Sequence, residues 1–158
     1  MKKVIALLCL LLCAGAAITA CSAGKDTKAD NSLKEIYREI KAEVSLPDMV
    51  ELDSADKLDR TYGITSGMVD GFAGGIDSSG VTMTEIVLIK AKDEDSAEQV
   101  AQKLNNRLQS KLDQNRTYNP EQAAIIEKCE VQTKGLYVTL IISGEAEKIT
   151  EIVNEHLK

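Results

Sequence analysis

An uncharged apolar run near the start of the chain decides how much of it can form a folded domain. Lys2 and Lys3 precede the run, which covers residues 4–18 and is 15 residues long. This order is typical of a secretory signal peptide, and the run is shorter than the roughly 20 residues that a membrane-spanning helix needs. We therefore expect residues 1–20 to be a signal peptide and the folded domain to lie within the 138 residues that follow.

The end of the leader predicts where it is cleaved. An aliphatic residue, two small residues and a cysteine follow one another: Ile18, Thr19, Ala20 and Cys21. This is the order of a lipobox, in which the cysteine thiol receives a diacylglyceryl group through a thioether before a peptidase cuts in front of it. Two acyl chains, such as palmitate, anchor a protein stably where one chain does so only marginally. The pattern predicts a lipoprotein on the outer face of the cell membrane; the alternative is an uncleaved anchor helix with an incidental cysteine.

Composition divides the rest of the chain and limits its partners. Residues 21–31 have no large apolar side chain and predict a lipidated cysteine with a flexible tether, whereas residues 32–158 have the length of a single domain. Without Lys2 and Lys3, 17 basic residues stand against 25 acidic ones, a net charge of −8. Such an acidic surface disfavours binding to nucleic acid and to anionic lipid headgroups.

The expected mature chain has one cysteine, Cys129, besides the predicted lipidation site. Cys9 and Cys13 leave with the leader and Cys21 is acylated, so Cys129 has no partner for an intramolecular disulfide. Cys129 stands at the start of a predicted strand, which favours a buried packing cysteine over a reactive thiol. From the sequence alone, both interpretations stay open.

Five segments carry the apolar period of amphipathic helices. The first starts with Ser32 as N-cap and Glu35 at the capping-box position, and it ends before Pro47. A long third helix has an apolar stripe between residues 97 and 112. The other helices are expected over residues 53–61, after an N-cap at Asn119, and around the apolar residues Ile149, Ile152, Val153 and Leu157; the long helix begins after Asp93 or Asp95.

Four further segments predict strands in two pairs. Short turn signals, residues 77–80 and Lys134-Gly135, separate the members of each pair. Glycines in the first strand indicate a bulge or an edge position. Paired strands with short connections predict an α+β fold, with an antiparallel sheet of about four strands and helices packed on one face. The strands are 68–76, 82–92, 130–133 and 136–143, and the glycines are Gly71, Gly74 and Gly75.

Short motifs over about residues 50–145 make the chain resemble a known family of small bacterial lipoproteins. They are Tyr62-Gly63-Ile64, Glu85-Ile86 leading to Lys90-Ala91-Lys92-Asp93, Arg107, Tyr118-Asn119-Pro120, and Lys134-Gly135-Leu136-Tyr137-Val138. The family is the one that carries domain of unknown function 4358. The resemblance implies an extracytoplasmic lipoprotein, typical of Gram-positive bacteria, with no assigned activity and no catalytic signature.

The sequence offers no complete set of catalytic or metal-binding residues. His156 is its single histidine, and its place in the last turn of a helix is explained by a favourable interaction with the helix dipole. A nucleophile triad would need His156 to meet a distant serine or cysteine, and a histidine–cysteine zinc site lacks ligands. Residues 93–95 resemble the start of a calcium loop, but Glu98 stands where an EF-hand needs glycine. We expect no catalytic residue, no metal and no cofactor, and therefore no enzyme.

Three functions are compatible with these features. The leading hypothesis is a non-enzymatic module that binds another exported protein or an envelope component. Arg107 and Tyr118 are its candidate contacts, because Arg and Tyr are enriched among the residues that dominate interfaces, although both could be purely structural. The alternative is a protein that binds a small ligand or an ion, acting as a sensor for a membrane complex. The third is an enzyme that uses a pair of carboxylates alone.

Overall fold

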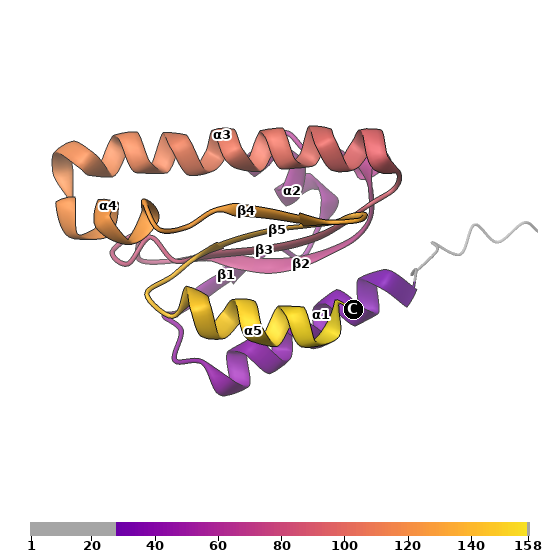
Figure 1. Cartoon of the computed structure of the whole chain (residues 1–158), viewed down its shortest axis with the longest axis horizontal. Helices are drawn as coiled ribbons and strands as arrows, with labels where there is room; N and C mark the ends of the chain where they lie inside the picture. Colours follow the sequence, from indigo (N-terminus) through magenta and orange to yellow (C-terminus); the bar gives the residue numbers. More distant parts are fainter. Residues whose placement is uncertain (1–27, 158) are drawn as a thin grey trace, which may run out of the picture.

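The computed structural model describes residues 28–157, so the predicted signal peptide and the lipidation site Cys21 lie outside the described residues. Figure 1 shows one sheet between two layers of helices. The elements along the chain are α1 (Lys28–Glu43), β1 (Met49–Glu51), α2 (Ala55–Tyr62), the 3-10 turn η1 (Ser66–Met68), β2 (Val69–Asp77), β3 (Glu85–Ala91), α3 (Glu94–Tyr118), α4 (Pro120–Ile126), β4 (Val131–Lys134), β5 (Tyr137–Ile142) and α5 (Ala146–His156).

Two apolar cores lie on the two faces of the sheet, whose antiparallel strands follow the order β1-β2-β3-β5-β4. Helices α2, α3 and α4 cover one face, and α1 and α5 cover the other (Figure 1). The first core includes Leu58, Val87, Leu104, Ile126 and Leu140. The second includes Leu33, Ile36, Ile86, Leu88, Ile149 and Ile152. The predicted α+β class and the antiparallel pairing are confirmed.

The sheet differs from the prediction in two details. It has five strands rather than about four, because Met49–Glu51 pairs with β2, and three residues are too few to show a strand period. Helices also cover both faces rather than one. The physical reason is the unbroken apolar run of residues 86–89 in β3, whose successive side chains point to opposite faces, so that both faces need cover.

Helix α1 begins earlier than the sequence predicts. It starts at Lys28, so Ser32 is not its N-cap, and residues 28–31 of the predicted tether are helical. These residues include no glycine or proline, so the amphipathic helix that follows can extend back through them. The predicted starts at Asp93 and Asn119 are confirmed, because each side chain accepts a hydrogen bond from the backbone N–H three residues later. Helix α2 begins after an N-cap at Ser54, close to the expected start at residue 53.

Two glycines of β2 let other parts of the chain approach its backbone. Gly74 has a φ of 147°, and a Cβ there would collide with the Ile86 carbonyl oxygen. A Cβ on Gly75 would collide with the Tyr37 hydroxyl of α1, so this glycine lets α1 lie close against the sheet. The register shift between Val69 and Gly71 supports the predicted bulge. The predicted edge position holds for Gly71, because β1 pairs only with residues 75–77 of β2 and none of the other described strands lies on that side.

Candidate functional site

A carboxylate with a fully buried side chain lies at the start of β3. Glu85 is 0% exposed and meets two cations from α3. Arg107 donates through Nε and Nη2, with Nη2 3.0 Å from Glu85 Oε2, and Lys111 Nζ lies 2.6 Å from the same oxygen. Arg107 and Lys111 are four residues apart and share one face of the helix. Lys111 also donates to the Met83 carbonyl oxygen at 3.0 Å, so this cluster fixes α3 against β3 and the turn before it.

These two cations set the ionisation state of Glu85. Burial by itself raises the pKa of Glu85, but the hydrogen bonds and charges of Arg107 and Lys111 outweigh burial and lower the pKa below its usual 4.5. Beside them the Tyr62 ring lies 5.8 Å from the Arg107 guanidinium carbon, and burial and the Glu85 charge raise the pKa of its hydroxyl. Glu85 is therefore an ionised structural carboxylate. It is not the raised-pKa acid that the carboxylate-enzyme hypothesis requires.

The two predicted contact residues have different surroundings. The Arg107 side chain is 31% exposed and is paired with Glu85, so it is not a free surface cation. Tyr118 is 89% exposed at the last residue of α3. They are separated by three helical turns, about 16 Å along the axis, so the structure does not bring them together. Only Tyr118 presents its side chain freely to a partner.

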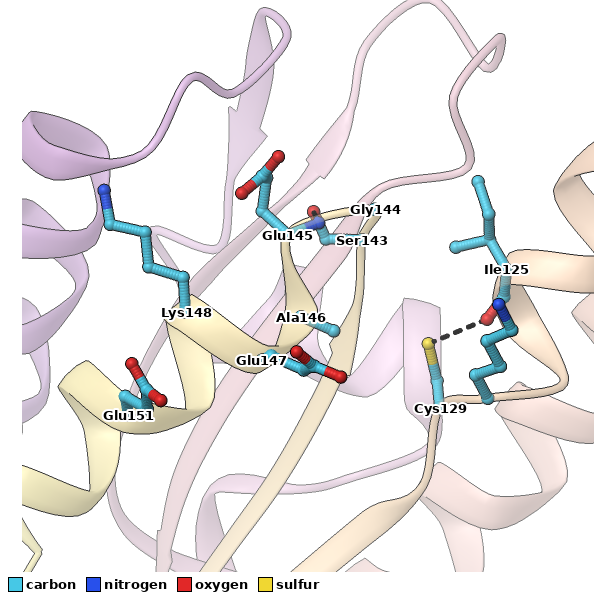
Figure 2. A pocket seen from close by; sticks show the side chains of 10 residues that line it. Ile125, Cys129, Ser143, Gly144, Glu145, Ala146, Glu147, Lys148 and Glu151 are labelled. Atoms are coloured by element: carbon cyan, nitrogen blue, oxygen red, sulfur yellow. Dashed lines mark hydrogen bonds between the residues drawn. The ribbon is translucent and has the colours of Figure 1, made fainter.

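A groove opens where α4, the end of β5 and the start of α5 meet. Its volume is about 600 Å³, and Figure 2 shows Cys129 on one wall and the first turn of α5 on the other. Cys129 is half-buried, and its thiol donates to the Ile125 carbonyl oxygen at 3.3 Å. Burial raises the pKa of this thiol, and a backbone hydrogen bond at Ser143 offsets only part of that effect. Cys129 both packs against the core and borders the groove, and it is a protonated thiol at neutral pH.

Helix α5 makes the groove acidic. Glu145, Glu147 and Glu151 line it, and none of the three forms an ion pair with another described residue. Lys148 also lines the groove, but its ammonium points toward α1 and donates to the Glu43 carbonyl oxygen (Figure 2). Lys128 is the other cation of the lining. The groove therefore has an excess of negative charge, suited to cationic or hydrogen-bond-donating groups.

The groove extends along the sheet toward its β4 edge. A second hollow of about 300 Å³ shares Cys129 and Glu147 with the first and is lined further on by Gln132 and Thr139. Gln132 and Thr139 are register partners on β4 and β5, and they face α5. The two hollows together form an elongated depression between α5 and the end of the sheet.

The comparison with known families gives one match. Residues 42–143 match the family model described as Domain of unknown function (DUF4358). The chain belongs to this family. No curated protein and no solved structure matches the chain. The DUF4358 match confirms the resemblance seen in the sequence motifs.

The DUF4358 match covers only part of the groove. It includes Cys129 and ends at Ser143, so the carboxylates of α5 lie beyond the matched residues. The buried cluster of Glu85, Arg107 and Lys111 lies wholly within it. The cluster is thus placed in the part of the chain that defines the DUF4358 domain, whereas one wall of the groove is contributed by residues outside that match.

Sequence reasoning did not find the Glu85 cluster or the groove. A signal for the cluster was present, because Arg107 and Lys111 stand four residues apart beside the apolar stripe of α3, and Glu85 directly precedes the buried run of β3. The groove had no comparable signal. Its walls come from residues near Cys129 and near Glu147, whose proximity depends on how α5 returns across the sheet.

Among residues 28–157 the structure contains no group of three or more histidine, cysteine, aspartate or glutamate side chains placed to hold a metal ion. Within the same residues, none of the helices combines the length and apolarity needed to cross a membrane. The single histidine, His156, lies in the last turn of α5 with Nε2 2.9 Å from Glu39 Oε2. It contributes a contact between α5 and α1.

Proposed function

We propose that this DUF4358 protein is an exported lipoprotein that holds a non-enzymatic binding domain at the outer face of a membrane. Cys21 is the proposed anchor, and another exported protein or an envelope component is the proposed partner. The acidic groove between α4 and α5 is the observation that carries the binding function. The anchor is supported by the lipobox and by the apolar leader before it.

The form of the groove favours an elongated partner. Its first hollow of about 600 Å³ continues into a second one of about 300 Å³ beside β4. The three groove carboxylates, from α5 and its N-cap, lack ion pairs with the described residues, so a partner can supply the matching cations without breaking existing pairs. Complementary charge steers association and selects the correct partner. A basic, extended segment of an exported protein meets both requirements.

Anchoring is tested by metabolic labelling with an alkyne-bearing palmitate analogue. In the Cys21→Ser variant the label should be lost, because no thiol remains to form the thioether. Cys13→Ser is the matched control, since Cys13 belongs to the expected leader and its loss should leave the label in place. If the Cys21→Ser protein kept its label, the anchor assignment would be wrong.

Partner binding is tested by chemical cross-linking in intact cells, affinity recovery of the full-length protein and mass spectrometry. One envelope protein should be recovered repeatedly with the wild-type chain and be lost with Glu147→Lys, which reverses a groove charge. Glu155→Lys is the control, because Glu155 is an exposed residue of the same helix that does not line the groove. Equal recovery with both variants would contradict the groove as the binding site.

Tyr118 is the second proposed contact. The side chain is 89% exposed and lies at the end of α3, where α4 begins. Tyr118→Ala should lower recovery of the same partner without changing the folded stability by more than about 0.5 kcal/mol. Unchanged recovery would remove Tyr118 from the proposed interface and leave the groove proposal standing.

A small ligand or ion is the alternative occupant. The groove volume of about 600 Å³ lies within the usual range for small-molecule sites, which favours this alternative. A saturating ligand raises the melting temperature of the protein that binds it. A thermal-shift screen of cationic metabolites and metal ions should then produce a shift that Glu147→Lys removes, while partner recovery from cells gives only membrane background.

A further inference from the structure

Strand β4 leaves one edge of the sheet open. The strand pairs with β5 on one side, and none of the other described strands pairs with its second side. Figure 1 shows β4 between the α3 layer and the layer of α1 and α5. At the opposite edge, β1 has only three residues, and its Glu51 is paired with Lys41 of α1. An open strand edge is a template for pairing with another strand.

The backbone of β4 has two residues whose hydrogen-bonding groups point outward. Ala91 N–H of β3 donates to the Leu136 carbonyl oxygen at 2.8 Å, so Leu136 faces β3. The direction of the backbone N–H and C=O groups alternates along an antiparallel strand, so those of Tyr137 and Thr139 in β5 point to β4. The same groups of their partners, Lys134 and Gln132 in β4, point back to β5. The remaining residues, Val131 and Thr133, therefore direct N–H and C=O to the open side.

Only three registers pair these outward groups with those of a second antiparallel copy. Val131 can face Val131, Thr133 can face Thr133, or Val131 can face Thr133. The first places Lys134 opposite Lys128 and the second places it opposite Gln132. The third places Lys134 opposite Glu130 twice, once on each side of the axis, and sets Gln132 opposite its own copy. Opposite charges directly across two strands stabilise the pair, and like charges destabilise it.

We propose that the β4 edge binds a second copy of this chain in this third register, joining two sheets into one across a twofold axis at Gln132. The segment from Glu130 to Lys134 is complementary in charge to itself, and Lys134 forms no ion pair with the other described residues. Among the described residues, the Glu130 side chain accepts a hydrogen bond from Gln132 Nε2 at 3.2 Å and forms no ion pair. Closed twofold symmetry is the commonest arrangement of homo-oligomers.

The pairing is also compatible with two anchored chains. Glu130, Gln132 and Lys134 line hollows on the α5 face, so a twofold axis normal to the sheet puts the α5 faces of both copies on the same side. Helix α1 covers this same face and is the first described element of the chain. Both copies of α1 would then begin on one side of the dimer. The pairing itself does not depend on the proposed function of the groove.

Disulfide trapping tests the register in the full-length protein in its own cells. Gln132→Cys, in a Cys129→Ser background, puts a thiol on the twofold axis. The two copies of residue 132 form a non-hydrogen-bonded pair there, with Cα atoms about 4.5 Å apart. This separation is within the range that a disulfide spans. Copper–phenanthroline oxidation should give a covalent dimer that reductant removes. Thr133→Cys in the same background is the control, since Thr133 faces Val131 and should give no dimer above Cys129→Ser alone. Equal dimer from both variants, or none from Gln132→Cys, overturns the proposal.

Charge reversal gives a second test, in which recovery of a mixed dimer controls for the folding of the altered chains. Glu130→Lys or Lys134→Glu alone, each added to Gln132→Cys, should abolish the disulfide dimer, because each places like charges opposite one another. Co-expression of the two, with different tags, should restore a mixed dimer, since the two altered strands are complementary to each other. Restoration also shows that both variants fold. If neither reversal lowers trapping, or the mixed dimer does not form, the register is wrong.

Discussion

Glu85 shows how one buried charge can fix a helix on a sheet. Its carboxylate is fully buried, and Arg107 and Lys111 of α3 both pair with the same oxygen. Taking such charges out of water costs several kcal/mol, and the pair repays this only when the geometry satisfies each partner. Here the second cation also donates to the Met83 carbonyl oxygen. The cluster therefore specifies where α3 lies, whatever its net contribution to stability.

Removing this charge should destabilise the fold. Glu85→Gln leaves two cations without a counter-ion, and breaking a buried pair costs roughly 3–5 kcal/mol; the partial exposure of Arg107 favours the lower end. Urea unfolding measures the loss. Asp56→Asn is the control, because the Asp56–Arg60 pair is exposed and should contribute less than about 1 kcal/mol. Similar losses in the two variants would mean that the cluster is not a structural tie.

Asp77 organises the turn between β2 and β3 through its carboxylate. Oδ1 accepts from the backbone and hydroxyl of Ser79, and Oδ2 accepts from the backbone and hydroxyl of Thr82, at distances of 2.7–2.9 Å. Burial raises the pKa of Asp77, but these hydrogen bonds outweigh it and hold the pKa well below its usual 3.8. The charged form is therefore the form that builds the turn.

Acid should unfold the domain through these two carboxylates. The folded state lowers the pKa of Glu85 from 4.5 and the pKa of Asp77 from 3.8, so it binds fewer protons than the unfolded chain in acid. Their stabilisation is complete above about pH 5 and is lost as the pH falls through the lower folded values. The free energy of unfolding should decline below that pH, and Asp77→Asn and Glu85→Gln should each flatten the decline. A pH dependence unchanged in both variants would contradict this account.

At the scale of elements, the close approach of α1 to β2 depends on Gly75. The Tyr37 hydroxyl lies where a Cβ on residue 75 would be, and the hydroxyl is buried without a hydrogen-bond partner among the described residues. Burial, with a contribution from the Glu51 charge, raises the pKa of Tyr37 to about 12. The hydroxyl is therefore neutral, and it contributes little beyond its packing.

Gly75→Ala should therefore cost about 1–3 kcal/mol through overpacking. Tyr37→Phe should change stability by less than about 1 kcal/mol, because the hydroxyl it removes makes no hydrogen bond with the described residues. In the double variant the cost should be smaller than in Gly75→Ala alone, since the atom that the new methyl group meets is gone. Thermal unfolding of the four proteins measures this coupling. Additive costs would show that the β1 backbone beside Gly75, and not Tyr37, limits the space.

Local sequence signals predicted the elements better than their arrangement. Asp93 and Asn119 could be predicted as helix starts because a cap is a contact between near neighbours. The start at Ser32 was wrong because the helical residues 28–31 carry no feature that identifies them. Strand β1 and the second helical layer depend on pairings between distant segments, which no local pattern encodes. The apolar run at residues 86–89 was the one local signal for the second helical layer, because a strand that is apolar at every position is buried on both faces.

The candidate site shows the same division. The sequence favoured Cys129 as a buried packing cysteine at the start of a strand, whereas the structure leaves it half-buried, two residues before β4. The carboxylates that share the groove with it come from α5 and its N-cap, after a further strand. Arg107 was predicted as a candidate contact for a partner, and the structure pairs it with Glu85 of the same chain. A surface cation and a buried one look alike in a helix pattern, because periodicity does not show what the helix packs against.

Cys129 can report whether the groove is filled. Burial raises the pKa of the thiol, so its thiolate fraction at pH 7 is small. Alkylation by iodoacetamide should be slower in the folded protein than in the urea-unfolded chain, and slower still when a partner occupies the groove. Rising pH should narrow the difference in alkylation rate between the folded and the unfolded protein. Equal rates in both states would show that the groove leaves the thiol fully accessible and its pKa unshifted.

At the scale of the whole molecule, the two faces of the sheet have different roles. The long helix α3 closes one face and holds the buried ion cluster, whereas α1 and α5 close the other (Figure 1). Helix α5 also borders the acidic groove. The proposed anchor precedes α1, which covers the same face as α5. A partner that contacts α5 would then lie on the same side of the sheet as the first described helix.

The proposed binding function depends most directly on the groove being the surface that contacts a partner. Site-specific photo-cross-linking in intact cells tests this directly, with p-benzoylphenylalanine in place of Glu147 in the groove or of Gln102, an exposed residue of α3 on the opposite face. We predict one discrete cross-linked product from position 147 that is absent from position 102. Indistinguishable products from the two positions, or none from position 147, would contradict the assignment of the groove as the binding site.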